Sequence, residues 1–330
     1  MRILLCISFL MSMLALVSCG GGGSGTSTQS SATTYQSVAT EGELVSYQVD
    51  TTNLTYSYEI IESAYGKTGV TGSGTLTRNA DGTYTPSAFA GKIVVLESGL
   101  LLGAIYEDLN GDNTDEVIPV MGVANPVNTF TGAAGTYNFI SRQCGTNNCE
   151  NYYGTFSLAD DGRWTSCLGA NLSAANFTCQ NSVTGETSGT ANGVAAISVN
   201  GTTAGSLIIF RDPTTGQKVI LLDLNGQTGL GQGAIYASTQ QLPSNVDGDW
   251  SYLHTDGTRG TVTVSGTSFT DSGIDSEGTT YTAIQGTFTL NTPWNGFVTT
   301  SDGAVLMPAG SGFYAGYFGQ NGTISVGLQK

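Results

Sequence analysis

One acidic segment carries oxygen-bearing side chains at a spacing suited to a hard cation. They occupy positions one, three, five and nine of a loop that follows a predicted strand: Asp108, Asn110, Asp112 and Glu116. A turning backbone at this spacing can direct several oxygens at one ion, as calcium requires. The sequence therefore offers Ca²⁺ as its one candidate cofactor. The simpler alternative, which we favour, is an acidic hairpin loop turned by Asn110 and Gly111.

The same segment resembles the calcium loops of dockerins and of integrin-type blade repeats. It departs from them at Asn113, where those loops carry glycine, although asparagine tolerates the left-handed conformation better than most residues. Position twelve is Pro119, so the bidentate glutamate of an EF-hand is also missing. These departures weaken what the resemblance implies, which is a bound calcium ion.

Residues for nucleophilic catalysis are scarce. His254 is the only histidine, so a Ser-His-Asp site would have to include it. It directly precedes a predicted turn at Asp256-Gly257, and we expect it to be an exposed residue at a strand end. The remaining enzymatic route is a carboxylate pair of the kind that glycoside hydrolases use. Among 25 acidic residues such a pair arises by chance, so we predict no catalytic residues and no enzyme.

Aromatic residues provide a second kind of candidate contact. Trp164 takes the same repeat position as Tyr84 and Phe269, which predicts a core residue. Trp294 lies in a polar turn with Pro293 and is the one candidate ligand-contact residue, for example by stacking on a sugar ring.

The six cysteines fall into three groups. Cys6 lies in the N-terminal apolar segment and Cys19 closes that segment. The other four lie within 36 residues: Cys144, Cys149, Cys167 and Cys179. An even number in an exported chain predicts two disulfides, for which three connectivities exist. We favour Cys144–Cys149 and Cys167–Cys179, because each pair would close a polar loop between neighbouring strands; a zinc site is the alternative.

The N-terminal segment carries signals for export. Arg2 supplies a positive charge, and Ile3 to Leu16 form an apolar run too short to span a bilayer of about 30 Å. The run ends in Leu16-Val17-Ser18-Cys19, which resembles the lipobox of bacterial lipoproteins. The resemblance implies a signal peptide at residues 1–18, a Cys19 modified with fatty acids such as palmitate, and a membrane anchor. Because Gly20 follows the cysteine, it also implies the outer membrane, on its periplasmic or outer surface.

Charge and composition limit the choice of partners and of fold. The formal net charge is −15, and such an acidic surface repels nucleic acid, because phosphate binding depends on lysine and arginine. The chain has 47 glycines and few helix formers, and no stretch keeps a helical apolar period. We therefore exclude nucleic-acid binding and predict an all-β fold of strands separated by tight turns.

Internal repeats divide the chain into three units. A Gly-Thr strand, a turn with Asp-Gly or Ser-Gly, and a strand that opens near an aromatic residue recur at 74–85, 154–165 and 260–270. After a lipidated cysteine and Gly/Ser/Thr linker at 19–40, we predict β units at 41–127, 128–243 (with two disulfides) and 244–330. Each would be an antiparallel sheet of barrel or sandwich type. A single barrel or propeller built from all three units is the alternative.

These observations favour a lipid-anchored cell-envelope protein that acts as a non-catalytic binding or structural, adhesive module. Its partners would be the membrane, through the N-terminal lipid, and an envelope protein or a polysaccharide. The alternatives are a surface-tethered carbohydrate-active enzyme that uses a carboxylate pair, and a small-ligand carrier of lipocalin-like type. Filled units favour the scaffold, a cleft with two facing carboxylates favours the enzyme, and an enclosed apolar cavity favours the carrier.

Overall fold

The fold is built from strands alone, as the sequence predicts. The computed structural model describes residues 32–88, 93–95, 98–109, 115–145, 148–173, 179, 181–320 and 322–330. These residues form 24 strands and no helix, so none of them belongs to a helix long and apolar enough to cross a membrane. The signal peptide, Cys19 and most of the predicted linker lie outside the described residues.

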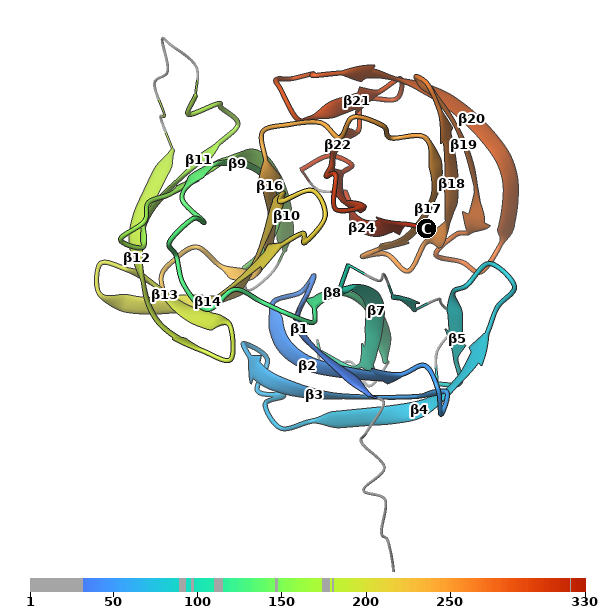
Figure 1. The fold of residues 1–330 in the computed structure, drawn as a ribbon, viewed down its shortest axis with the longest axis horizontal. Helices are drawn as coiled ribbons and strands as arrows, with labels where there is room; N and C mark the ends of the chain where they lie inside the picture. The colour runs from blue at the N-terminus through green and yellow to red at the C-terminus, as the bar shows by residue number, and fades with distance from the viewer. Residues whose placement is uncertain are drawn as a thin grey trace, which may run out of the picture. The chain divides into compact units, whose positions relative to one another are not determined.

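The first sheet is an eight-stranded antiparallel meander in which the first strand also pairs with the last, so the fifth and sixth strands form its two edges (Figure 1). They are β1 (Thr33–Ala39), β2 (Glu43–Asp50), β3 (Thr55–Ser63), β4 (Thr71–Arg78), β5 (Tyr84–Pro86), β6 (Val94–Val95), β7 (Leu100–Glu107) and β8 (Glu116–Val123). The first strand, β1, pairs with both β2 and β8. At the opposite side, Tyr84 and Ile93 form an antiparallel bridge between β5 and the residue before β6, so the two outer strands of this sheet also meet.

The second and third sheets repeat this order and close into barrels. The second contains β9 (Gly135–Cys144), β10 (Cys149–Leu158), β11 (Arg163–Leu168), β12 (Ser182–Ala191), β13 (Val194–Val199), β14 (Thr202–Arg211), β15 (Lys218–Asn225) and β16 (Gln232–Thr239). The third contains β17 (Gly248–His254), β18 (Arg259–Ser265), β19 (Ser268–Ile274), β20 (Thr280–Leu290), β21 (Val298–Thr300), β22 (Val305–Pro308), β23 (Phe313–Tyr317) and β24 (Ile324–Gln329). In each barrel the last strand pairs with the first.

Three related β units are thus present, in place of one barrel or propeller assembled from the whole chain. One prediction is wrong: the linker does not extend to residue 40, because β1 begins at Thr33. Tyr35 and Val38 of this strand are fully or almost fully buried, since β1 lies between β2 and β8. The stretch is rich in threonine and short of large apolar residues, so its burial comes from its two neighbouring strands rather than from its own hydrophobicity.

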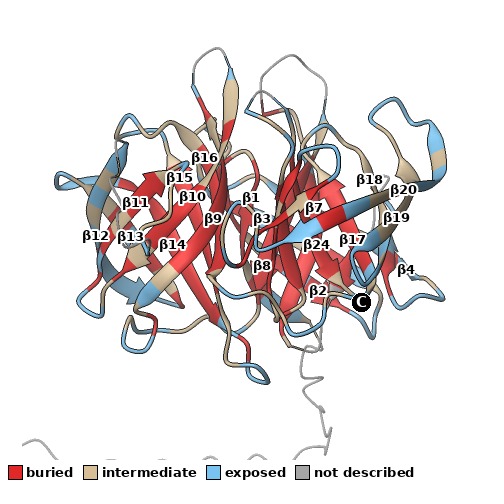
Figure 2. Cartoon of the chain, turned by 90° about the horizontal axis from the view of Figure 1, so that it is seen from above, coloured by how far each residue is buried: buried red, intermediate tan, exposed pale blue. Residues whose placement is uncertain are grey.

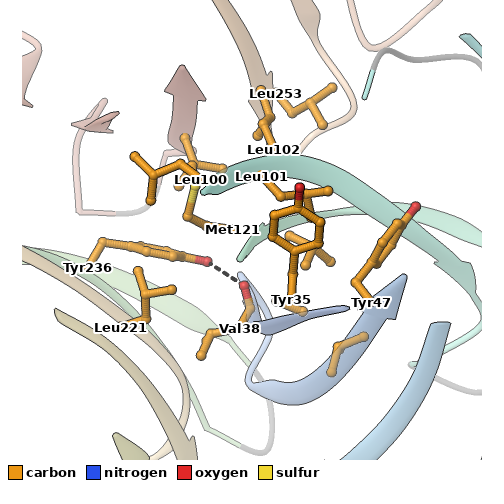
Figure 3. Packing of buried hydrophobic residues seen from close by; sticks show 14 of the residues in the cluster. Tyr35, Val38, Tyr47, Leu100, Leu101, Leu102, Met121, Leu221, Tyr236 and Leu253 are labelled. Carbon is orange, nitrogen blue, oxygen red and sulfur yellow. Dashed lines mark hydrogen bonds between the residues drawn. The ribbon is translucent and has the colours of Figure 1, made fainter. Parts of the chain in front are cut away.

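One hydrophobic cluster contains buried residues from all three sheets. Strand β8 contributes Met121, β15 contributes Leu221 and β17 contributes Leu253. Tyr236 of β16 lies in the same cluster, and its hydroxyl donates to the carbonyl oxygen of Val38 at 3.3 Å (Figure 3). The outward faces of these strands are therefore buried as well as their inward faces.

Burial differs sharply from strand to strand as a result. Figure 2 shows β8, β14 and β24 as mostly buried, whereas β12 and β20 are mostly exposed. Strands that face both a barrel interior and a neighbouring sheet have nearly continuous apolar sequences, because both of their faces are covered. Strands on the outside of a unit keep the alternation of buried and exposed residues.

Candidate functional site

The inner face of the third barrel lines a partly open cavity of about 690 Å³. Alternate residues of β17 point into it, namely Trp250, Tyr252 and His254, whereas Leu253 between them belongs to the shared core. The apolar part of the lining also includes Val262, Val264, Phe269, Ile284, Phe288, Val298, Leu306 and Tyr314. Cavities of about 300–1,000 Å³ with mainly apolar walls are the usual size and character of small-molecule sites.

Glycines lie opposite aromatic rings in the wall of this barrel. A Cβ atom at Gly286 would lie 2.3 Å from Cζ of Phe269, and one at Gly327 would lie 2.2 Å from Cε1 of Tyr314. The rings therefore lie flat against the barrel wall over the glycines, an arrangement that only a residue without a side chain permits. Four such cross-strand pairs are present: Phe269–Gly286, Tyr252–Gly260, Tyr314–Gly327 and Tyr281–Gly273.

The interior of the second barrel is filled instead. One cluster of buried side chains occupies it, with Trp164 stacked on Phe156 at a centroid distance of 5.9 Å. The prediction that Trp164 is a core residue is confirmed. The other large members of this cluster are Tyr137, Phe139, Leu158, Ile197, Leu207, Ile209, Ile220, Leu222, Leu224 and Ile235. The repeated framework is the same in both barrels, so the size of the inward side chains decides which one is hollow.

Tyrosines fill much of the interior of the first sheet. The ring of Tyr47 stacks on Tyr58 at 5.9 Å and on Tyr56 at 6.1 Å. The Tyr47 hydroxyl also crosses the sheet to donate to the carbonyl oxygen of Ala104 at 3.2 Å. All three tyrosines are buried, so this interior is packed and hydrogen-bonded.

A carboxylate lies on the otherwise apolar wall of the third-barrel cavity. Oδ1 of Asp271 accepts a hydrogen bond from the Tyr252 hydroxyl at 2.8 Å, and Oδ2 accepts one from the Tyr281 hydroxyl at 3.4 Å. The two hydroxyl oxygens are also within hydrogen-bond distance of each other, so the two hydroxyl protons are shared among the three groups. Burial raises the pKa of Asp271, and the two tyrosine hydroxyls oppose this effect. Burial also raises the pKa of Tyr252 well above its ordinary value, so both partners of Asp271 are neutral donors at pH 7.

His254, the single histidine, lines this cavity. Its ring lies between Tyr252 and Phe318, with centroid distances of 4.9 and 4.8 Å. Burial lowers the pKa of His254 to about 4, although the nearby Asp256 carboxylate acts in the opposite direction. His254 ends β17 as expected, but the expectation that it is exposed is wrong: it is half-buried, faces the barrel interior and is neutral at pH 7.

The cavity lining is acidic and carries no counter-charge. Besides Asp271 it includes Asp275 and Asp302, and the described lining residues contain no lysine or arginine. Asp275 accepts hydrogen bonds from the backbone N–H groups of Glu277 and Thr279, at 3.0 and 2.7 Å. Asp302 accepts one from the Thr300 hydroxyl. These two carboxylates therefore have roles in turns, and Asp271 is the one placed among aromatic rings.

The predicted calcium loop connects β7 to β8, whose ends pair through Glu107 and Glu116. Asn110 and Asp112, two of the four predicted ligands, lie outside the described residues, so the calcium site stays a prediction. Asp108 and Glu116 flank that segment.

Removal of calcium provides the test of this loop. Pairing of Glu107 with Glu116 is the geometry of a hairpin loop, so we expect the midpoint of thermal unfolding to be the same in EDTA and in millimolar Ca²⁺. A midpoint several degrees higher in Ca²⁺ that returns on chelation would show that the loop binds the ion. Thermal unfolding in Mg²⁺ controls for nonspecific screening of the acidic surface.

The four cysteines of the second unit form the two favoured disulfides. Cys144 pairs with Cys149 and Cys167 with Cys179, with Cα–Cα distances of 3.9 and 5.9 Å. The first links the neighbouring strands β9 and β10. The zinc alternative is wrong, because disulfide sulfurs offer no thiolate ligand.

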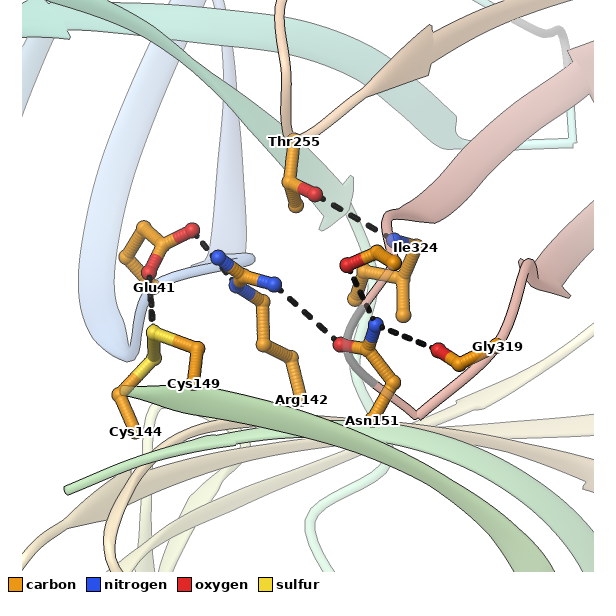
Figure 4. Close-up of polar contacts among 9 residues, drawn as sticks. Glu41, Arg142, Cys144, Cys149, Asn151, Thr255, Gly319 and Ile324 are labelled. Carbon is orange, nitrogen blue, oxygen red and sulfur yellow. Dashed lines mark hydrogen bonds and ion pairs between the residues drawn. A yellow bond between two sulfur atoms is a disulfide. The ribbon is translucent and has the colours of Figure 1, made fainter.

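A buried polar cluster surrounds the first disulfide and connects the three sheets (Figure 4). Glu41 pairs with Arg142 at 2.8 Å, and its second carboxylate oxygen lies 3.3 Å from Sγ of Cys144. Arg142 also donates to Oδ1 of Asn151 at 3.3 Å, and the Asn151 amide donates to the carbonyl oxygen of Gly319 at 3.1 Å. Burial raises the pKa of Glu41 while Arg142 opposes the rise. The cluster serves packing between sheets and leaves no open position for a ligand group.

Trp294 lies away from the cavity. It is half-buried, its indole N–H donates to Oδ1 of Asn138 at 2.8 Å, and its ring packs against Tyr153 and Phe297. These contacts link the second and third sheets and account for the residue structurally. Ligand contact by Trp294 stays a prediction that this placement does not support.

Comparisons with known proteins provide no independent guide to this site: the sequence matches no family model and no curated protein, and no solved structure matches the chain. The class is therefore defined by geometry alone. It is an all-β chain of three related eight-stranded meanders, of which the third is a closed barrel with a small-molecule-sized interior.

Sequence reasoning missed the residues that line this cavity. Phe269 shares the repeat position of Tyr84 and Trp164, which predicts a core residue, and the sequence around Asp271 contains no motif that predicts a site. The pairing of glycine with an aromatic ring gives no signal for the cavity, because the filled second barrel has it too, at Gly185 and Trp164. The cavity follows from which side chains the strand register turns inward.

Proposed function

We propose that this chain is a lipid-anchored protein of the cell envelope whose third barrel binds a small, mainly apolar molecule. The observation that carries the proposal is the cavity of about 690 Å³ on the inner face of a closed barrel. Eight strands are enough to hold one small ligand when the inward side chains leave room for it. The Trp250 indole N–H donates to the carbonyl oxygen of Val246 at 3.0 Å, which fixes a large ring on the wall before any ligand arrives.

This proposal corresponds to the small-ligand carrier, one of the alternatives that the sequence leaves open. We favour it over a purely structural module because one of the three units is hollow. It is also favoured over a carbohydrate-active enzyme. Glycosidases need one carboxyl group to protonate the leaving group and another to act as base or nucleophile. Asp275 and Asp302 line the cavity together with Asp271, but both accept hydrogen bonds within their own turns, and this placement favours a structural role for them over proton transfer. An envelope protein or a polysaccharide as partner stays a prediction.

Binding of an uncharged apolar fluorophore, N-phenyl-1-naphthylamine, tests the proposal. We expect saturable fluorescence enhancement with one site per chain. Val262→Trp places a large ring inside the barrel, and Gly286→Leu forces the Phe269 ring off the wall. Each should weaken binding at least about tenfold, because the apolar volume available to the probe is occupied.

The matched control is Thr289→Leu, which adds a leucine at an exposed position of β20, the strand that carries Gly286. It should leave binding unchanged. Equal binding by wild type and by both lumen variants, with unfolding midpoints that show them folded, would contradict the proposal.

The anchor part of the proposal rests on Leu16-Val17-Ser18-Cys19, which lies outside the described residues. We expect Cys19→Ser to move the chain from the membrane fraction to the soluble fraction, because the acyl chains would be missing. A Cys19→Ser chain that still needs detergent for release would contradict it. Mass spectrometry of the native N-terminus provides the complementary measurement.

A further inference from the structure

We propose that the ligand of the third barrel is an organic cation, with an apolar body and an amine or quaternary ammonium group held beside Asp271. This inference rests on the proposed function, since it names the chemical class of the molecule that the cavity binds. It is carried by the cavity together with its charge and its aromatic walls.

The first argument is the missing counter-charge. Asp271 faces the cavity, and its two side-chain partners there, Tyr252 and Tyr281, are neutral hydroxyls. Ionised carboxylates in apolar surroundings require a cationic partner to offset the lost hydration. The described lining supplies none, because it contains no lysine or arginine and His254 is neutral. A ligand that brings its own positive charge would complete this site.

The second argument is the aromatic wall around that carboxylate. Trp250 and Tyr314 meet edge to face at a centroid distance of 5.7 Å, and both line the cavity with Tyr252, Phe269 and Tyr281. The faces of such rings attract cations, and they do so most strongly where water is excluded. Aromatic rings combined with one carboxylate are suited to an ammonium group that carries apolar substituents.

Other ligand classes fit this lining less well. An anionic ligand would face three carboxylates and no cationic side chain among the described lining residues. A bare divalent ion would need several oxygen ligands at one point, whereas this wall is mainly apolar. The net charge of −15 further favours the approach of cations to the protein.

Three competitors with the same ten-carbon apolar chain provide the test: decyltrimethylammonium, 1-decanol and undecanoate, each used below its aggregation concentration. Each is titrated against the wild-type protein in the presence of N-phenyl-1-naphthylamine, and its displacement of the fluorophore is measured. We expect the cation to bind at least about tenfold more tightly than the alcohol, and the carboxylate most weakly. Asp271→Asn should remove the preference for the cation while leaving displacement by 1-decanol within about twofold.

The control variant is Asp249→Asn, which makes the same change of charge at an exposed position of β17. It should keep the preference, which separates a local effect of Asp271 from general attraction to an acidic protein. If all three competitors bind equally, or if Asp271→Asn keeps the preference for the cation, the inference is wrong while the proposed function stands. If neither the fluorophore nor any competitor binds the wild type, the proposed function fails and this inference fails with it.

Discussion

Glu43→Gln is expected to stabilise the protein at pH 9 by about 2–4 kcal/mol and to change its stability little at pH 5. Glu43 is fully buried, and its Oε2 atom accepts no hydrogen bond from the described residues. Asp223 of β15 is almost fully buried too, and its Oδ1 atom is likewise without a described donor. Burial, and secondarily the charge of Asp223, raises the pKa of Glu43 from 4.5 to about 8.

The sign of the effect follows from proton linkage. A carboxyl group whose pKa is raised by folding binds its proton more tightly in the native state than in the unfolded state. Its contribution to stability is complete below pH 4.5 and is lost as pH rises through about 8. Glutamine keeps the shape of the neutral acid and cannot ionise, so the variant avoids that loss.

Urea unfolding at pH 5, 7 and 9 measures this difference. The matched control is Glu59→Gln on the neighbouring strand β3, where the side chain is exposed and the change should shift stability by less than about 0.5 kcal/mol at every pH. A wild-type protein equally stable at pH 5 and pH 9, with no gain from Glu43→Gln, would show that this carboxyl ionises without cost.

Tyr236→Ala is expected to lower the free energy of unfolding by about 3–5 kcal/mol, which is the usual cost of removing a large buried ring. The ring is fully buried in the cluster that the three sheets share, and its centroid lies 6.2 Å from that of Phe313 in the third barrel. The variant would leave a void between sheets and a carbonyl oxygen at Val38 without its side-chain donor.

Tyr236→Phe separates these two effects. It keeps the ring and removes only the hydroxyl, so it should cost about 1 kcal/mol. Because the cluster is shared, we also expect Tyr236→Ala to increase hydrogen exchange of the third-barrel strands β22 to β24. Exchange that rises in the second barrel alone, or a loss of less than about 1 kcal/mol, would mean that the sheets are stabilised independently.

Local features of the fold could be predicted because their causes are local. Asp81-Gly82 and Asp161-Gly162 turns were recognised from sequence, and both glycines have positive φ, at 82° and 86°. The pairing of Cys167 with Cys179 also followed from short-range spacing.

Features that depend on distant parts of the chain could not be predicted. Burial of β1 depends on its pairing with β8, about eighty residues further along the chain. Leu253 and His254 are adjacent, yet one joins the shared core and the other faces a cavity. The hollow interior depends on the sum of side-chain volumes around a closed ring, and that sum requires the register of all eight strands.

Contact quenching of Trp250 tests most directly whether a ligand enters the third barrel. The chain has three tryptophans, so Trp164→Phe combined with Trp294→Phe leaves Trp250 in the cavity wall as the sole reporter. A second protein that keeps only Trp164 reports on the filled second barrel. We predict that a bromoalkanol and the corresponding bromoalkylamine quench Trp250 saturably and leave Trp164 unaffected. Equal quenching of both tryptophans, or quenching of neither, would contradict a ligand site inside the third barrel.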